Sequence, residues 1–243
     1  MADLPATAPV RVWALPPVWG APNPSPFVIK LLTWLRMAGI AYETPPMTRP
    51  PASRTGKIPY VELADGRILY DSGLIVETLA AERGVDLDAG LDPLARARGH
   101  VIRRACEEHL YFAGAWERWL GAGAERTRAD YFRHLPAPLR PIAAFVATRN
   151  MRRNLHGQGL ARHRPEDVVR AARADVDALA TLVGAGPYVL GDTPRTVDAT
   201  VHGLLWALRS NPYESAMRAL VEGHPNLVAY SDRMRERYWG DWR

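Results

Sequence analysis

Hydrophobic and polar positions follow two different patterns along this chain, and the change falls near residues 84–93. The first part contains short runs of β-branched, aromatic and other apolar residues, which are typical of strands. These runs lie at residues 10–15, 41–44, 58–63 and 67–70. The last two are joined by Ala64-Asp65-Gly66, so we expect them to form a β-hairpin.

Helical spacing appears twice in the first part and almost everywhere in the second. Residues 26–37 and 73–83 place apolar side chains three and four positions apart, which predicts amphipathic helices. After the connector VDLDAGLDP, candidate helices cover residues 94–120, 128–150, 165–182, 197–210, 214–222 and 225–238. The predicted order is therefore strand, helix, strand, hairpin and helix, followed by an all-helical part.

Length and composition indicate a globular protein. Of the 243 residues, 47% are apolar and 23% charged, which is enough for one or two hydrophobic cores. A single cysteine, Cys106, cannot form an internal disulfide, and this favours a reducing compartment. The opening segment MADLPATAPV lacks the features of a secretory signal, and no segment approaches the roughly 20 apolar residues that span a bilayer. We therefore expect a cytoplasmic protein without a transmembrane segment.

The charge pattern narrows the possible partners. The formal net charge is +5, and Lys30 and Lys57 are the only lysines, so nearly all cations are guanidinium groups. Basic residues are densest over residues 149–164, but this stretch lacks the interleaved aromatic residues of a nucleic-acid groove. We expect no nucleic-acid partner. The seven histidines include no closely spaced ligand pair, so we expect no metal site.

Ser25 and Pro26 stand where the first predicted helix begins. Serine is a good N-cap and proline a good first helical residue, so one interpretation is that they only start the helix. A helix N-terminus also offers unpaired N–H groups and a positive potential, which lower the pKa of a nearby thiol by at most about 1.5 units. In this second interpretation, the Ser25 hydroxyl donates a further hydrogen bond to the sulfur of a thiol ligand.

Two further motifs flank the predicted hairpin. Pro59 begins a strand after Lys57 and Ile58, and Lys57 is either an ordinary exposed lysine or a contact for a ligand carboxylate. Asp71 and Ser72 precede the second helix, where Ser72 is a predicted N-cap and Asp71 complements the helix dipole. Alternatively, Ser72 and the free N–H groups bind a carboxylate while Asp71 binds an ammonium group. An α-amino acid presents both charges together.

Several segments together resemble the glutathione transferase superfamily, and within it the failed-axon-connections and metaxin-like branch, including its bacterial members. They are SPFVIKLLTWLRMAGIAYE, GKIPYVELADGRILYDSGLIVETL, GQGLARHRPEDV, GDTPRTVDATVHGLL and HPNLVAYSDRMRERYW. The resemblance implies a thioredoxin-like α/β domain, which we place at residues 8–83, and an all-α domain, which we place at residues 94–243. It also implies a homodimer that binds glutathione in the cleft between the domains.

The resemblance assigns roles to the motif residues. Ser25 falls at the thiol-activating position, Ile58-Pro59 at the cis-proline step, where the Ile58 backbone pairs with the ligand, and Asp71-Ser72 at the γ-glutamyl step. The predicted glutathione-binding residues are Ser25, Phe27, Lys57, Ile58, Pro59, Asp71 and Ser72. Tyr111 and Trp116 lie on the helix that borders the electrophile pocket in this superfamily, although aromatic residues at helical spacing are more often part of a core.

Two functions follow from these expectations. The first is an enzyme that stabilises the thiolate of glutathione with Ser25 and transfers it to, or uses it to process, a small hydrophobic electrophile. The second is a non-catalytic binding protein on the same scaffold, in which the basic stretch at residues 149–164 contacts an anionic partner or a membrane surface.

Overall fold

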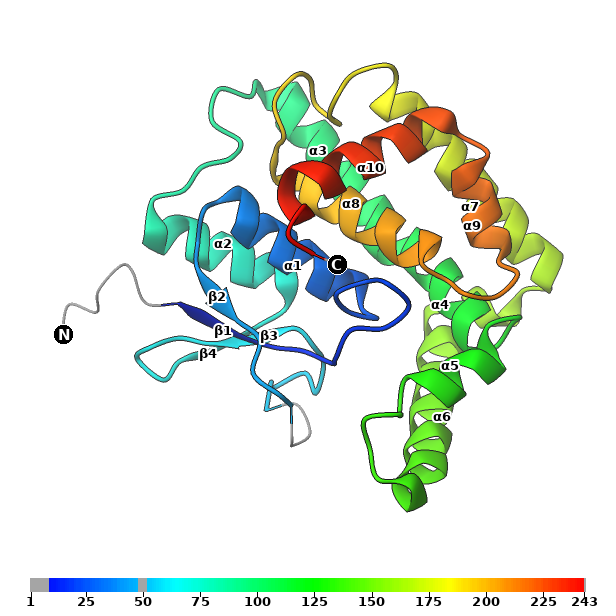
Figure 1. The fold of residues 1–243 in the computed structure, drawn as a ribbon. Coiled ribbons are helices and arrows are strands. Elements are labelled where there is room, and N and C mark those ends of the chain that lie inside the picture. Colours follow the sequence, from blue (N-terminus) through cyan, green and yellow to red (C-terminus); the bar gives the residue numbers. More distant parts are fainter. Residues whose placement is uncertain (1–8, 48–51, 243) are drawn as a thin grey trace.

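The computed structural model describes residues 9–47 and 52–242 (Figure 1). The predicted domain start at residue 8, the final residue 243 and most of the opening MADLPATAPV segment lie outside the described residues. A small mixed sheet, with α1 (Pro26–Met37) and α2 (Ser72–Arg83), forms one part of the molecule, and helices form the other (Figure 1).

The sheet contains four strands in the order β2-β1-β3-β4. These are β1 (Val10–Trp13), β2 (Tyr42–Glu43), β3 (Tyr60–Glu62) and β4 (Ile68–Tyr70). β1 and β2 are parallel, whereas β3 is antiparallel to both β1 and β4. Each strand is shorter than its predicted run. Prolines explain two of the lost ends, because Pro16, Pro17 and Pro59 have no N–H to donate to a sheet.

Both helices of the first part follow the predicted hydrophobic pattern. α1 buries Val28, Leu31 and Leu35 and begins and ends where the sequence predicts. It packs against α8 (Thr196–Arg209) of the helical part. Gly203 allows this contact, since a Cβ atom there would lie 2.8 Å from both the Pro26 carbonyl oxygen and the Lys30 backbone nitrogen. The close approach of α8 fixes the beginning of α1 against the helical part.

The helix predicted over residues 94–120 is a continuous helical segment with an irregular middle. It consists of α3 (Pro93–Ala105), a π-helical turn η1 (Cys106–Leu110) and α4 (Tyr111–Trp119). Such turns insert one extra residue and change the direction of the side chains that follow. Glu107 projects from this turn toward the first part of the molecule, as described below.

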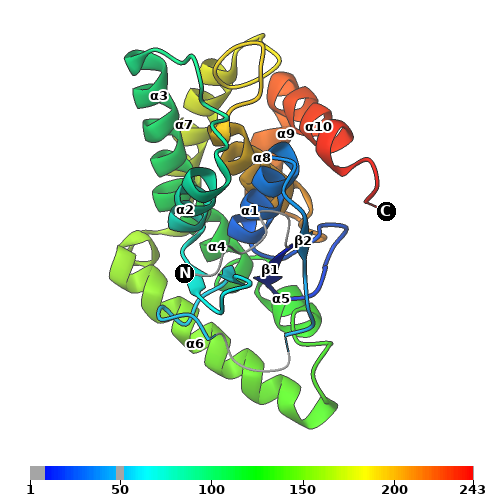
Figure 2. The same ribbon diagram turned by 90° about the vertical axis from the view of Figure 1, so that its left-hand side faces the viewer.

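The single helix predicted over residues 128–150 is wrong. The chain instead forms α5 (Ala124–Asp130), a 3₁₀ turn η2 (Ala137–Leu139) and α6 (Arg140–Gln158). Pro136 and Pro138 explain the interruption, because proline lacks an N–H and disfavours helical geometry in the residue before it. Viewed from the side, α6 crosses the lower edge of the molecule (Figure 2).

The remaining predicted helices agree with the structure to within two residues. They are α7 (Pro165–Val183), α8, α9 (Ala216–Glu222) and α10 (Pro225–Trp239). The 3₁₀ turn η3 (Leu160–Arg162) was not predicted. Trp206 and Trp239 of the helical part are buried in the hydrophobic core of the first part. The indole N–H of Trp239 donates to the Thr33 hydroxyl at 3.0 Å. The two parts therefore share a core.

Within residues 9–47 and 52–242, no helix has both the length and the apolar composition needed to cross a membrane.

Candidate functional site

The three sequence motifs lie at one end of the sheet. Trp13, the last residue of β1, pairs with Tyr60, the first residue of β3, and Tyr60 pairs with Tyr70, the last residue of β4. The loop that leads to Ser25, the Ile58-Pro59 step and the Asp71-Ser72 step therefore leave the sheet side by side. The strand register brings together residues that are up to 57 positions apart in the sequence, as for Trp13 and Tyr70.

Ser25 precedes the first turn of α1 with an extended backbone. Its carbonyl accepts from the Val28 and Ile29 N–H groups, and its own N–H donates to the Asn23 side chain at 2.9 Å. Its half-buried hydroxyl makes no capping hydrogen bond. Among the described residues, none accepts from that hydroxyl or from the backbone N–H of Phe27. Two hydrogen-bond donors are thus available at this helix start.

A buried arginine fixes the loop before Ser25. Arg118 of α4 donates to the Pro24 carbonyl at 2.7 Å, the Ala207 carbonyl at 2.9 Å and the Asn211 side chain at 3.0 Å. Its guanidinium also lies 5.4 Å from the centre of the Trp19 ring. The helical part therefore determines where the residue next to Ser25 lies. No local sequence pattern distinguishes Arg118 from the many exposed arginines, so this role could not be predicted.

The Ile58-Pro59 peptide bond is cis. In the described part of the chain, no residue hydrogen-bonds to the Ile58 backbone N–H or carbonyl. The buried Ser53 hydroxyl holds the preceding residue, accepting from the Lys57 N–H at 3.0 Å and donating to its carbonyl at 2.7 Å. The Lys57 side chain is exposed. Ser53 is a supporting residue that the sequence analysis missed.

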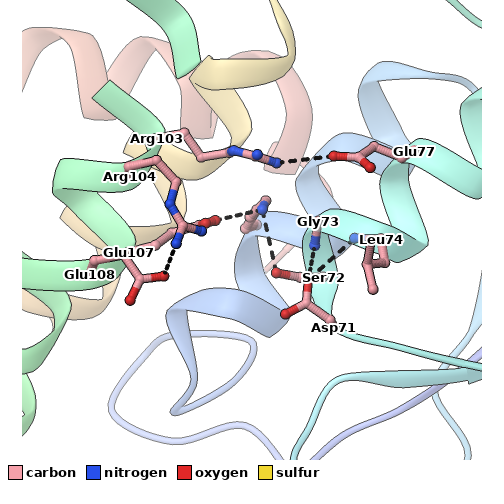
Figure 3. Close-up of polar contacts among 10 residues, drawn as sticks. Asp71, Ser72, Gly73, Leu74, Glu77, Arg103, Arg104, Glu107 and Glu108 are labelled. Carbon is pink, nitrogen blue, oxygen red and sulfur yellow. Dashed lines mark hydrogen bonds and ion pairs between the residues drawn. The ribbon is translucent and has the colours of Figure 1, made fainter. Parts of the chain in front are cut away.

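Asp71, and not Ser72 as predicted, is the N-cap of α2. Its carboxylate accepts from the N–H groups of Gly73 at 2.9 Å and Leu74 at 3.2 Å (Figure 3). Asp71 has a φ of 69°, a conformation that aspartate tolerates better than most residues. This backbone rotation makes Ser72 the first residue of the helix, and Ser72 is buried.

A buried lysine lies behind Ser72. The Lys30 ammonium is 3.4 Å from the Ser72 hydroxyl oxygen and 2.6 Å from the Glu107 carboxylate. Burial lowers the pKa of Lys30, and the neighbouring Glu107 partly offsets this effect. Glu107 belongs to the helical part, so this contact joins both parts of the molecule at the motif (Figure 3). Lys30 was visible in the sequence as a charge within an apolar helix, but no role was assigned to it.

Neither Tyr111 nor Trp116, the two residues predicted for an electrophile pocket, lines the cleft beside Pro24. Tyr111 packs edge-on against Phe27 with ring centres 4.7 Å apart, while Trp116 packs on the core of the helical part. The cleft has a volume of about 490 Å³ and lies beside Pro24. It is lined mainly by the proline-rich loop, including Trp19, and by Arg126, Tyr131, Arg133 and His134. The sequence analysis did not identify these residues as a site.

Cys106 lies in the interior, and burial raises the pKa of its thiol to about 12. It is therefore a poor nucleophile. In the part of the chain that the structure describes, no group of three or more His, Cys, Asp or Glu side chains is arranged to hold a metal ion.

Two family models match this chain. The model for the glutathione S-transferase N-terminal domain matches residues 26–124, and the model for the glutathione S-transferase C-terminal domain matches residues 172–234. Among curated proteins, the chain is 32% identical over 245 residues to the isoprene-epoxide glutathione S-transferase of a Rhodococcus species. That alignment covers 94% of this chain and 99% of the relative.

More distant relatives come from the branch that the sequence analysis named. The chain is 25% identical to Failed axon connections of Drosophila melanogaster, an alignment that covers 91% of this chain and 56% of that protein. It is also 25% identical to Metaxin-2 of Mus musculus, in an alignment that covers 78% of this chain and 73% of that protein. These matches confirm the resemblance to both the superfamily and the branch.

Solved structures confirm the predicted fold class. A glutathione S-transferase from Methylobacterium radiotolerans, in complex with glutathione sulfonate, superposes with a TM-score of 0.62 at 20% identity, covering 97% of this chain and 94% of that one. A glutathione transferase from Phanerochaete chrysosporium gives a TM-score of 0.65 at 15% identity, with 94% and 96% covered. At these identities the likeness concerns the fold alone.

Proposed function

The chain belongs to the glutathione S-transferase superfamily, and on that premise we propose that it binds glutathione and transfers its sulfur to a small hydrophobic electrophile. The observation that carries this proposal is the register Trp13–Tyr60–Tyr70, which sets the three motifs at one end of the sheet. Each functional group of glutathione has a complementary partner in one of these three motifs.

We assign the residues as follows. The Ser25 hydroxyl and the Phe27 N–H stabilise the thiolate, since both donors lack a partner among the described residues. The Ile58 backbone, presented by Pro59, pairs with the extended peptide as an added strand would. Lys57 meets the glycine carboxylate, while Ser72 binds the γ-glutamyl carboxylate and Asp71 its ammonium group.

The chemistry that these groups support is nucleophilic attack. The thiolate sulfur forms a bond to an electrophilic carbon, and the bond to the leaving oxygen or halogen breaks with its electron pair. Placement and exclusion of water supply most of the acceleration, because a thiolate is already a strong nucleophile. The cleft beside Pro24 accommodates the electrophile. Tyr111 lies near the same end of α1, because its ring packs against Phe27 in the first turn of that helix. Trp116 does not line this cleft, and its place in an electrophile pocket stays a prediction from the sequence.

A titration tests binding before chemistry. Calorimetry with glutathione should show saturable binding, and an isoprene epoxide is the first electrophile to assay, given the name of the Rhodococcus relative. Ser25→Ala should lower kcat by roughly 10- to 100-fold, the worth of a hydrogen bond to a charged group. Ser25→Thr, which retains a hydroxyl, is the matched control. Unchanged turnover in Ser25→Ala would remove Ser25 from the mechanism, and no heat of binding would reject the enzymatic proposal.

We further propose that the protein is a homodimer. Ile68 of β4, Leu74 of α2 and Val101 of α3 are large apolar side chains that are 42%, 54% and 64% exposed. β4 contacts α2, and the Arg103–Glu77 ion pair joins α3 to α2, so covering these side chains would bury apolar area. Light scattering at several protein concentrations should give twice the chain mass of 27.0 kDa.

A second candidate function rests on the outer face of α6. No Asp or Glu occurs between residues 131 and 165, a segment that contains seven arginines. Arg164 pairs with Glu166 and Asp167, but no described residue forms an ion pair with Arg149, Arg152 or Arg153. A non-catalytic protein would use this surface for an anionic partner. It should then bind vesicles that contain anionic lipid, release them at high salt, and show no conjugation.

A further inference from the structure

Lys30 is placed unusually for a lysine. It belongs to the second turn of α1, is 2% exposed, and connects α1 to the start of α2 and to the π-helical turn of the other part. Lysine is rarely buried so completely unless it is paired. The Glu107 carboxylate provides the pair, at 2.6 Å, and is itself only 11% exposed. A charge pair in this position requires a structural or functional reason, because burying ions is unfavourable.

The direction of the hydrogen bonds indicates a function at Ser72. An ammonium group can only donate, so the Ser72 oxygen must be the acceptor in its 3.4 Å contact with Lys30. The hydroxyl proton of Ser72 is then directed away from Lys30 and free to be donated to another acceptor. The contact also places a positive charge behind the oxygen, which makes the hydroxyl a better donor to an anion.

Glu107 favours the charged form of Lys30. Without a carboxylate nearby, burial would favour the neutral amine, which could accept the Ser72 proton and reverse the hydrogen bond. Other charges near Lys30 act in both directions, since Arg103 disfavours its ammonium form and Asp71 favours it. Glu107 belongs to the helical part, so that part contributes to the site without touching the ligand.

We propose that Lys30 and Glu107 are positioning residues that orient the Ser72 hydroxyl toward a ligand carboxylate, so that the protein discriminates γ-glutamyl peptides that carry the α-carboxylate from those that lack it. The inference rests on the proposed glutathione site and adds two buried residues to it. It assigns the recognition of one functional group to an ion pair that spans both parts of the molecule.

A purely structural role makes a different prediction. A buried ion pair replaced by apolar side chains of similar size often leaves stability unchanged or improved. The double variant Lys30→Met/Glu107→Leu should therefore fold, whereas each single variant leaves a polar group without its partner. If the pair served only packing, the double variant would bind every glutathione analogue as the unsubstituted protein does.

The experiment measures calorimetric affinities for two probes. One is glutathione, and the other is γ-aminobutyryl-cysteinyl-glycine, which is glutathione without the α-carboxylate. Lys30→Met and the double variant should bind glutathione about tenfold more weakly and the analogue within about twofold of the unsubstituted protein, as expected for one hydrogen bond to a charged group. In a Ser72→Ala background, Lys30→Met should have no further effect on glutathione affinity.

The exposed pair Arg104 and Glu108, 2.8 Å apart in the same region, provides the matched control. Arg104→Met/Glu108→Leu removes the same kind of pair and should leave both affinities unchanged (Figure 3). Equal weakening for the two probes, or no weakening in the double variant, would overturn the positioning role while leaving the glutathione site intact. If the unsubstituted protein binds neither probe, the proposed function and this inference fail together.

Discussion

The beginnings of α1 and α2 make an informative comparison, because each combines a serine, a helix N-terminus and a buried cation. At α1, Arg118 binds the backbone carbonyl of Pro24 and leaves the Ser25 hydroxyl unpaired among the described residues. At α2, Asp71 caps the helix and Lys30 contacts the Ser72 hydroxyl directly. The same sequence signal therefore has two physical outcomes.

The difference matches the two kinds of group that the proposed glutathione site has to bind. A thiolate needs donors that have no other partner, and the start of α1 provides them. A carboxylate and ammonium pair needs donors and an acceptor at fixed places, and the start of α2 provides these through Asp71 and the supported Ser72. In both cases the support comes from side chains that are distant in the sequence.

Removing the cation at the first helix start should have the largest effect on stability. Arg118→Met leaves three acceptors without their buried donor, and we expect the free energy of unfolding to fall by about 3 kcal/mol. Urea denaturation measures this change. Arg104→Met, at an exposed pair, should lower stability by less than about 1 kcal/mol. Equal effects of the two substitutions would show that Arg118 does not fix the Ser25 loop.

His202 of α8 is buried like Arg118 and Lys30, but it differs from them because neither of its ring nitrogens has a hydrogen-bond partner among the described residues. Burial, with Arg235 and Arg209 nearby, lowers its pKa to about 3. The unfolded chain therefore binds a proton below about pH 6.5 that the folded protein does not, so stability falls as the pH falls. Between pH 7 and pH 5 this one group should remove about 2 kcal/mol.

The test compares urea denaturation at these two pH values. His202→Leu should lose about 2 kcal/mol less on acidification than the unsubstituted protein. His156→Gln, at an exposed histidine of α6, controls for the loss of an imidazole elsewhere. An unchanged pH dependence in His202→Leu would show that this histidine is protonated in the folded protein.

The smallest expected effect on stability concerns the cap of α2. Asp71→Ala removes the acceptor for two N–H groups and should destabilise the protein by about 1 kcal/mol. Asp92→Ala, which removes the N-cap of α3 in the same way, is the matched control. Asp71→Ala should show the larger thermal shift, because alanine tolerates a φ of 69° less well than aspartate, and only Asp71→Ala should weaken glutathione binding. Weaker binding in both would mean that the effect on affinity is general destabilisation.

Much of the fold was predictable because it depends on local patterns. The two helices of the first part and most helices of the second appear at their predicted places, since their apolar spacing matches the face that each one buries. The helix over residues 128–150 was wrong because periodicity outweighed the two prolines in the interpretation. Ser72 was misassigned as the N-cap because both Asp and Ser are good caps, and only the backbone angle of Asp71 distinguishes them.

The sequence by itself determined the strand and helix order, the superfamily and the three motifs, because these depend on residues close together along the chain. Only the tertiary structure decided that no described residue pairs with the Ser25 hydroxyl, that a cleft opens beside Pro24, and that Lys30 contacts Glu107 behind Ser72. These features arise between residues as many as 119 positions apart, as for Leu15 and His134 of the cleft. Their geometry depends on how α8 and the π-helical turn pack against α1.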